Sequence, residues 1–506
     1  MINRGEFGTK TIVLRKTENG IEAVGDKNVF IGYKIGDEDS RHGVFAEWKY
    51  ENDCLEFIND EYGFFPVCYY QDDDVFAIST APLELLELCK VKELDTAAIA
   101  VFLRMEMFLG DMTPFKGIKV LPPGISLKYD VNGLSITQDA MAKEGAKSDI
   151  SLDDAIIKFG ELFQKAVDKY KDAGLKKIGL PLSGGRDSRH ILFALDKAKL
   201  DVDTALTTMA QAPKPDQDAI IAQEVTKELG INHVLFDQPA ISLEQELEKN
   251  EVTNFMSLHH SWIVPVANHL EENGFDAIYD GICGGTLSAG EFLTKNRYDL
   301  YKAGKYEEIV DDVIGDDGYL EKMIGEENYK IFNRELAVKT YAAELEKQKD
   351  FRNPIAMFSL WNLSRRSGAA SSWMILQRKC HVFAPFLDPE VFEFLTSLPV
   401  EYFLDHNFHT KAISKFYPQY AHLPYENKDA PRKKVKTSEA ITQSLKLLFY
   451  YLKNLGGGAK ISFRFVIMRT IKGLLFPSYY NEENSMHYIP IYLTHIEKYL
   501  TKDKPE

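Results

Sequence analysis

The stretch Lys176–Ala198, KKIGLPLSGGRDSRHILFALDKA, sets a short apolar run against a Ser-Gly-Gly turn and a charged segment that follows it. The apolar run predicts a buried strand, and the segment from Asp187 predicts a helix. Glycine has no Cβ, so two adjacent glycines let the backbone N–H groups of the turn approach an anion closely. The dipole of the following helix adds partial positive charge. The pattern therefore predicts a phosphate-binding turn, although a tight strand-to-helix turn could use the same glycines.

An acidic residue inside this turn indicates a metal ion. Ser183 and Ser188 can donate hydroxyl groups to a phosphate, but the carboxylate of Asp187 would repel it. Mg²⁺ commonly bridges carboxylates and phosphates, so we expect it to lie between them. No Gly-Lys-Ser/Thr ends the turn, which excludes a Walker A loop.

The segments that follow alternate between strand-like and helix-like patterns. Alternation of this kind is typical of a parallel sheet covered on both faces, as in doubly wound α/β proteins. Ligands of such sheets lie at the carboxyl ends of the strands. The expected strands are 177–182, 203–209, 233–237 and 276–282, and the expected helices are 187–198, 217–230 and 242–250.

The rest of the chain divides into three predicted parts. Residues 1–145 hold short β-rich runs separated by turn dipeptides, and they predict a separate domain. A polar linker follows, with Ser151 as the N-cap of a helix. We expect the nucleotide-binding domain over 151–440 and a helical extension over 441–506, because the chain is mostly helical in pattern from about residue 290.

The composition of the chain limits the kinds of molecule and compartment that are expected for it. The net charge of −16 argues against general nucleic-acid binding, which needs a basic face. The five cysteines are scattered without metal-ligand spacing, which favours core thiols in a reducing compartment and a cytoplasmic protein. The most apolar long stretch, 461–476, is interrupted by three basic residues, so it predicts an amphipathic helix packed on the protein, with attachment to a membrane surface as a minority alternative and no stable insertion.

Several motifs together resemble one family. The run LSGGRDSR (182–189) resembles the PP-loop of the ATP pyrophosphatase superfamily, whose members cleave ATP between the α and β phosphates. The surrounding segments resemble the class B asparagine synthetases, in the order that the family has them. In such proteins a glutaminase half with an Ntn-hydrolase-like α+β sandwich precedes the PP-loop synthetase domain. The matching segments are 61–88 and 113–130 in the glutaminase-like half, and 207–233, 278–291, 383–399 and 409–418 in the synthetase-like half.

The resemblance implies roles for particular residues, with ATP and Mg²⁺ as cofactors. Asp187 would bind Mg²⁺ and act in catalysis, and Lys411 would stabilise negative charge at the acyl centre. Asp388 would either line the substrate pocket or cap a helix, and Arg365 would either contact an anionic substrate or pyrophosphate or remain an ordinary helix-end charge. The implied ATP-binding residues are Leu182, Ser183, Gly184, Gly185, Asp187, Ser188, Leu206, Thr207, Gly281, Gly284 and Gly285.

The sequence also departs from the family pattern. The glutaminase half of the family uses a cysteine directly after the initiator methionine, whereas the first cysteine here is Cys54, so we expect no glutamine hydrolysis. Asparagine-forming members carry an Asp-Glu pair where this chain has Gly285-Thr286. Our alignment puts Ser359 and Asn362 where those members have a glutamate and a metal-binding aspartate. These departures weaken the expected metal site and make aspartate a less secure substrate.

The expected function is an ATP-dependent amide ligase that activates a carboxylate as an acyl-AMP, releases pyrophosphate and joins the acyl group to an amine or ammonia. The carboxylate could be a small molecule or a peptide, and a homodimer is left open. One alternative is a specialised ligase that closes a lactam or peptide ring or amidates a glycan or metabolite. A second alternative is a non-catalytic nucleotide-binding relative. Another PP-loop chemistry, such as tRNA thiolation, fits poorly with the acidic composition.

Overall fold

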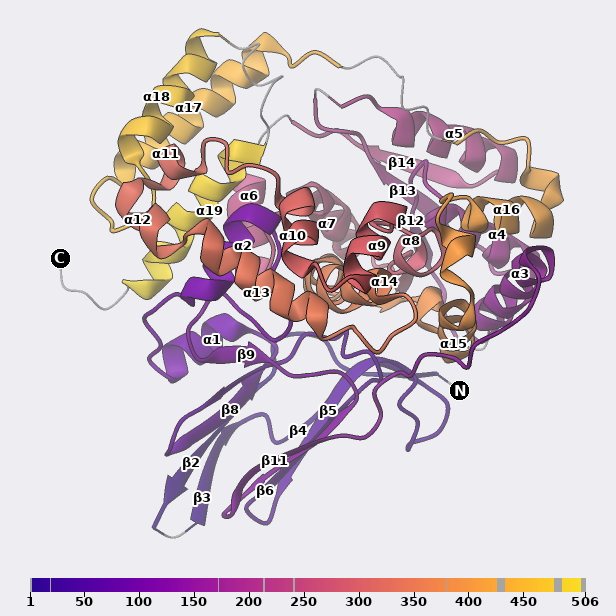
Figure 1. Cartoon of the computed structure of the whole chain (residues 1–506), viewed down its shortest axis with the longest axis horizontal. Helices are drawn as coiled ribbons and strands as arrows, with labels where there is room; N and C mark the ends of the chain where they lie inside the picture. The colour runs from indigo at the N-terminus through magenta and orange to yellow at the C-terminus, as the bar shows by residue number, and fades with distance from the viewer. Residues whose placement is uncertain are drawn as a thin grey trace.

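The computed structural model describes residues 2–18, 20–171, 173–212, 214–239, 242–378, 380–425, 433–476 and 485–501. Its N-terminal part is a sandwich of two antiparallel sheets, drawn in indigo and purple at the bottom of Figure 1. The first sheet has the order β1 (Ile2–Arg4), β4 (Asn28–Ile35), β5 (Gly43–Glu51), β6 (Cys54–Asn59), β10 (Ile125–Asp130) and β11 (Gly133–Gln138). The second has the order β3 (Gly20–Gly25), β2 (Thr11–Thr17), β8 (Val75–Ser79), β7 (Cys68–Gln71) and β9 (Ile118–Val120).

Apolar side chains that alternate along these strands fill the space between the two sheets. Trp48 and Phe57 lie on the first sheet with ring centroids 6.3 Å apart, and Phe76 of the second sheet stacks on Tyr129 of the first at 4.6 Å. Helices α1 (Pro82–Leu88) and α2 (Thr96–Met105) lie in the chain between β8 and β9 of the second sheet. The expected α+β sandwich is therefore confirmed.

The second part contains a parallel sheet, as the alternating pattern predicted, but it has five strands where the sequence indicated four. Its spatial order is β14 (Asn232–Phe236), β13 (Thr204–Thr208), β12 (Ile178–Pro181), β15 (Ala277–Tyr279) and β16 (His381–Phe383). The first strand in the chain is thus central, and the order reverses between β12 and β15. In open α/β sheets this reversal leaves a crevice at the carboxyl ends of the strands.

Helices flank this sheet. The helices α4 (Asp187–Ala198) and α5 (Gln217–Leu229) connect neighbouring strands on one side of the reversal. The chain then crosses back to β15 through α6 (Leu243–Val252) and α7 (Val264–Glu272). Because such crossovers are right-handed, α7 lies on the opposite face from α4 and α5, which gives the predicted doubly wound arrangement.

Helix α3 (Leu152–Asp168) precedes the first strand of this sheet in the chain. Its N-cap is Ser151, whose side chain accepts a hydrogen bond from the Asp154 backbone N–H, as the sequence predicted. It packs against α15 (Pro389–Ser397) and α16 (Phe408–Phe416) at the C-terminal end of the domain.

A helical region lies between β15 and β16. It carries two consecutive stretches of π-helical turns, which often mark functional or strained positions. The π-helical stretches cover Ser359–Gly368 and Ala370–Leu376. The helices are α8 (Gly284–Ser288), α9 (Lys295–Lys302), α10 (Tyr306–Ile314), α11 (Leu320–Ile324), α12 (Glu326–Ile331), α13 (Arg334–Glu346) and α14 (Pro354–Phe358).

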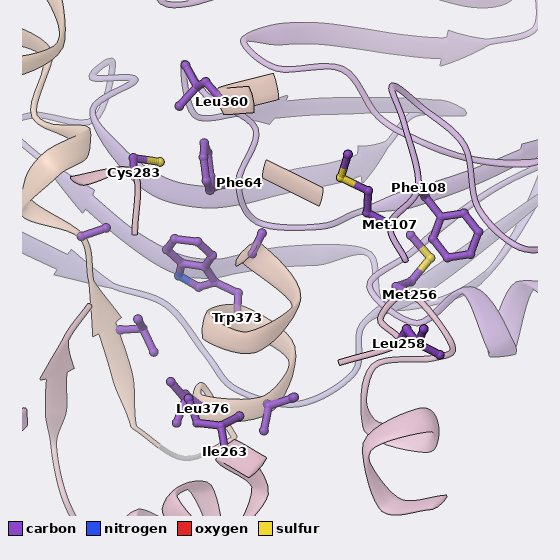
Figure 2. Close-up of a cluster of buried hydrophobic side chains, with 14 of the residues drawn as sticks. Phe64, Met107, Phe108, Met256, Leu258, Ile263, Cys283, Leu360, Trp373 and Leu376 are labelled. Carbon is purple, nitrogen blue, oxygen red and sulfur yellow. The ribbon is translucent and has the colours of Figure 1, made fainter. Parts of the chain in front are cut away.

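The sandwich and the parallel-sheet part share a continuous apolar core. Figure 2 shows Phe64 of the sandwich close to Trp373 of the π-helical stretch, and their ring centroids are 5.7 Å apart. Tyr33 of β4 lies edge-on to Phe383 of β16, with ring centroids 4.8 Å apart, and its hydroxyl accepts a hydrogen bond from the Ala384 N–H at 3.0 Å. The two parts therefore pack as one body through buried contacts.

The C-terminal helices are α17 (Thr437–Lys453), α18 (Phe463–Leu475) and α19 (Ser485–Leu500). The first two lie side by side at the outer edge of the molecule (Figure 1). The segment predicted as an amphipathic helix thus forms α18 and packs on the protein. Across the described residues, we find no helix with the length and apolar content needed to cross a bilayer.

Candidate nucleotide-binding site

A cavity of about 290 Å³ opens where the strand order reverses. Its walls come from the carboxyl ends of β12, β13 and β15, from the first turns of α4 and α5, and from the start of α7. This is the place where a ligand of an open α/β sheet is expected. The lining residues are Pro181, Leu182, Ser183, Asp187, Ser188, Leu206, Thr207, Thr208, Asp218, Trp262, Ile263, Val266, Asp280, Gly281 and Ser371.

The Ser-Gly-Gly turn connects β12 to α4, and its Ser183 lines the cavity. The Gly184 N–H donates to Asp218 Oδ1 at 2.7 Å, and the Gly185 N–H donates to Ser183 Oγ at 3.2 Å. The Ser183 N–H donates to Ser188 Oγ at 3.1 Å. These three N–H groups are the donors that the sequence assigned to phosphate, and each has an oxygen acceptor from the protein. A phosphate oxygen at this turn would therefore replace a carboxylate or hydroxyl oxygen of the protein.

Leu206 and Thr207, at the end of β13, are held by a short hydrogen-bond chain. The Thr207 hydroxyl donates to the Leu182 carbonyl at 2.6 Å and lies 2.8 Å from His233 Nε2. Leu206 is 2% exposed and Thr207 3%, so they present only small areas to the cavity. An adenine at this wall would contact the edges of these residues rather than open faces.

The glycine-rich loop after β15 wraps around Asp187. The Gly285 N–H donates to Asp187 Oδ2 at 2.9 Å. A Cβ on Gly284 would lie 2.5 Å from Asp187 Cγ, and one on Gly281 would lie 2.8 Å from Asp187 Cβ. Such contacts are too close for any side chain, so glycine at these two positions is a packing requirement of the aspartate.

A second carboxylate, Glu291, converges on Asp187. A Cβ on Gly285 would lie 3.0 Å from Glu291 Oε2 and 3.6 Å from Asp187 Oδ2, so the two carboxylates meet beside the missing side chain. Partial burial, and then the negative charge of Asp187, raise the pKa of Glu291. The sequence reasoning missed Glu291, because it lies five residues beyond Gly285-Thr286, where the resemblance placed the family's Asp-Glu pair.

The donor set at this place fits Mg²⁺. Mg²⁺ is usually bound by one or two carboxylates together with phosphate oxygens and water, and two carboxylates that repel each other gain from a cation between them. Among the described residues, no group of three or more His, Cys, Asp or Glu side chains is arranged to hold a metal by itself. The site would therefore need the nucleotide phosphates to complete the coordination.

Asp187 is also held from the side of α16. His409 is fully buried, its Nδ1 lies 3.3 Å from Asp187 Oδ1, and its Nε2 lies 3.0 Å from His190 Nδ1. Burial, and then repulsion by His409, lower the pKa of His190 well below its ordinary value, which keeps that imidazole neutral. His409 thus lies against Asp187, a contact that the spacing of histidines in the sequence does not signal.

Several predicted site residues do not line the cavity. Gly184, Gly185, Gly284 and Gly285 belong to the two loops beside it, whereas Lys411, Asp388 and Arg365 make contacts elsewhere. Lys411 is two residues from His409 on α16, which puts the two side chains on different faces of the helix, and its Nζ donates to Asp405 Oδ2 at 2.9 Å. Asp388 caps α15, where it accepts from the Glu390 N–H at 3.1 Å and also pairs with Lys169. Two roles were expected for Asp388, lining the substrate pocket or capping a helix, and these contacts are those of a helix cap.

Arg365 likewise lies outside the cavity. It is buried and donates to the carbonyls of Gly63, at 3.1 Å, and Leu121, at 2.6 Å, both in the sandwich. Burial, and then repulsion by Arg366, lower its pKa to about 9. The structure therefore directs Arg365 to the sandwich and not to a substrate.

A larger cavity of about 460 Å³ adjoins the first, and Trp262 lines both. Its walls carry carboxylates and imidazoles as well as aromatic rings, so it suits a polar molecule with an apolar portion. The lining residues are Glu106, Gln211, Lys214, Glu246, His259, His260, Ser261, Trp262 and Tyr488.

The fold and the cavity place the chain among α/β proteins that bind ligands at the switch point of a parallel sheet. The asparagine synthase family model matches residues 158–419, more than half of the chain, so the chain belongs to the asparagine synthase family. It is thus an enzyme of a family of ATP-dependent, amide-forming ligases.

Other comparisons add little. A comparison with curated protein sequences finds no match. Among solved structures, the chain is similar at 11% identity to a glutamine phosphoribosylpyrophosphate amidotransferase from B. subtilis complexed with ADP and GMP, with a TM-score of 0.16. The similarity covers 46% of this chain and 52% of the other, so the chain spans about half of that protein, and a TM-score this low carries no inference about fold.

Proposed function

We propose that the chain activates a carboxylate as an acyl-AMP with ATP, releases pyrophosphate, and transfers the acyl group to an amine or ammonia. The observation that carries the proposal is the cavity in which the Ser-Gly-Gly turn, Asp187 and the second glycine-rich loop meet at the switch point of the sheet. A carboxylate is a poor electrophile, and adenylation gives it a good leaving group.

The residues of the cavity have separable tasks in this reaction. The N–H groups of Gly184 and Gly185 would exchange Asp218 and Ser183 for phosphate oxygens, and the serine hydroxyls would donate to the same oxygens. Asp187 and Glu291 would hold Mg²⁺ against the phosphates. When bound, Mg²⁺ would offset the negative charge that builds up as pyrophosphate leaves.

The second substrate would occupy the adjoining cavity. A reaction between an acyl-AMP and an amine needs both molecules at one place, and the two cavities share the wall formed by Trp262. The volume of about 460 Å³ exceeds the need of a single small amino acid. Together with Gly285-Thr286 in the second loop, this favours a specialised carboxylate or amine over aspartate and ammonia.

Lys411 is proposed to stabilise negative charge at the acyl centre. It is already on the helix that carries His409, and its Nζ would have to leave Asp405 to reach a substrate. Catalysis by Lys411 therefore implies a rearrangement at the start of α16 on substrate binding.

The sandwich is proposed not to hydrolyse glutamine. A nucleophilic cysteine needs a thiolate, and hence a lowered pKa. Burial raises the pKa of all three cysteines of the sandwich: Cys54, Cys68 to about 12, and Cys89 to about 11. None of these thiols is therefore activated.

Pyrophosphate release in the presence of ATP, Mg²⁺ and a panel of carboxylates tests the proposal. The parent protein should release pyrophosphate with at least one carboxylate, and Lys411→Met should lose about 100-fold or more of that rate while still binding ATP. Asp405→Asn, which removes only the surface partner of Lys411, is the matched control and should keep the rate. ATP binding without turnover on any carboxylate would favour the non-catalytic alternative.

A further inference from the structure

We propose that the outer face of the α17–α18 hairpin docks on an anionic lipid surface. This hairpin face consists of Leu445, Phe449, Leu452, Leu455, Met468, Leu475 and Phe476. The proposal is independent of the nucleotide site, because it rests on a different part of the molecule.

The hairpin face concentrates exposed apolar side chains. Phe449 is 71% exposed, Leu475 65%, and Met468 and Phe476 61% each. Of the seventeen large apolar side chains that are exposed among the described residues, seven belong to this face. Scattered exposed apolar residues are ordinary on a protein surface, but a concentration of them on one pair of packed helices is typical of an interaction site.

The spacing of the exposed apolar residues along α17 places them on one side of the helix. Leu445, Phe449 and Leu452 recur at intervals of four and three residues, which aligns them in one stripe on the helix. Leu447 and Tyr451, on the other side of α17, are fully buried. The helix therefore has two apolar sides, one packed on the protein and one facing solvent.

The basic residues of the hairpin favour a negatively charged partner. Between Ala440 and Phe476 the sequence has six basic residues and no acidic residue, although the whole chain has a net charge of −16. The side chains of Lys453 and Arg464 are exposed beside the apolar stripes. An apolar stripe flanked by basic residues matches the interface of a bilayer that contains anionic lipids.

Other partners fit this surface less well. Nucleic acid would satisfy the basic residues but would leave the large aliphatic side chains in water. A second copy of the hairpin would cover the apolar stripes but would bring two basic faces together. Because no described helix can span a bilayer, the contact would be peripheral, with the helices lying in the headgroup region.

Flotation of the full chain with lipid vesicles tests the proposal. The parent should float with phosphatidylcholine vesicles that contain about 30% phosphatidylglycerol, should bind pure phosphatidylcholine weakly, and should be released by high salt. Phe449→Ser/Leu452→Ser should lower the partition coefficient on anionic vesicles by about tenfold or more. Lys453→Gln/Arg464→Gln should lower it by about fivefold for each charge removed.

The matched control is Val24→Ser/Val131→Ser, which removes exposed apolar side chains from the sandwich and should leave vesicle binding unchanged. All substituted side chains are exposed, so the variants should fold as the parent does. An unchanged unfolding temperature in each variant verifies that they do. The proposal is overturned if the parent does not bind anionic vesicles, or if the Phe449/Leu452 variant binds as well as the control. It is also overturned if the hairpin face supports only a dimer, detected by light scattering, that the same variant abolishes.

Discussion

The two loops that flank the strand-order reversal differ in how closely they follow their family's pattern. The first loop, Ser183–Ser188, keeps the serines, glycines and aspartate that the pattern requires, and its N–H groups are held by oxygens of the protein. The second loop, Gly281–Glu291, has Gly285-Thr286 at the position where the sequence resemblance implies an acidic pair in asparagine-forming members. It nevertheless brings a carboxylate beside Asp187, from Glu291.

The comparison teaches that a carboxylate can lie beside Asp187 although the residues next to it in the second loop, Gly285 and Thr286, carry no charge. The second loop cannot vary freely, because Gly281 and Gly284 are packed against Asp187 and no side chain fits there. A carboxylate can reach the same point from the far end of the loop. The first loop depends on local sequence, and the second depends on the tertiary contact between them.

The largest effect should come from filling the contact between the loops. In Gly284→Ala the added Cβ would lie 2.5 Å from Asp187 Cγ, so the aspartate must move. We expect pyrophosphate release to fall about 100-fold or more, with a loss of about 1–3 kcal/mol in unfolding free energy from overpacking. Gly457→Ala, whose Cβ would meet only the Asn454 carbonyl at 3.3 Å, is the control. Equal rates in the two variants would mean that the position of Asp187 does not matter.

A smaller effect should follow from removing the second carboxylate. Glu291→Gln keeps the shape of the side chain but removes its charge, so the Mg²⁺ concentration that gives half-maximal activity should rise about tenfold. Adding Gly285→Asp to this variant puts a carboxylate at the position that asparagine-forming relatives use, and it should recover most of the loss. Mg²⁺ titrations of ATP binding provide a readout that does not depend on turnover. If Glu291→Gln needs no more Mg²⁺ than the parent, the second loop contributes no metal ligand.

The smallest effect concerns the buried histidine pair behind the first loop. The pKa of His190 is lowered in the folded protein, whereas the unfolded chain takes up this proton near pH 6.5. Stability should therefore fall as the pH drops below about 6.5, by about 1.4 kcal/mol per pH unit for this one group. Urea unfolding at pH 7.5 and 5.5 measures the change, and His190→Phe should show a smaller difference between the two pH values. An equal difference in parent and variant would assign the pH dependence to other groups.

The sequence predicted what depends on neighbouring residues. The Ser-Gly-Gly turn between a strand and a helix, the N-cap at Ser151 and the four strands expected between residues 177 and 282 follow from local patterns, and the structure has all of them. The spatial order of the strands and the fifth strand, β16, were not predicted. Glu291 and His409 were missed as neighbours of Asp187, because only the folded chain brings α16 and the end of the second loop to it.

Arg365 illustrates the opposite case. A basic residue near a predicted anion site invites a role in binding, but its guanidinium is buried against carbonyls of the sandwich. The sequence contains no sign of this contact, because the two segments are joined only by domain packing. Local patterns thus identified the Ser-Gly-Gly turn, and tertiary packing decided which charges surround it.

The most direct test of the account is calorimetric titration of ATP, with and without Mg²⁺, into the parent protein and into Asp187→Ala. The account predicts that the parent binds MgATP more tightly than ATP alone, and that Asp187→Ala loses this preference for Mg²⁺ together with pyrophosphate release. If Asp187→Ala bound MgATP and turned over as well as the parent, the first loop could not be the metal-assisted phosphate site proposed for it.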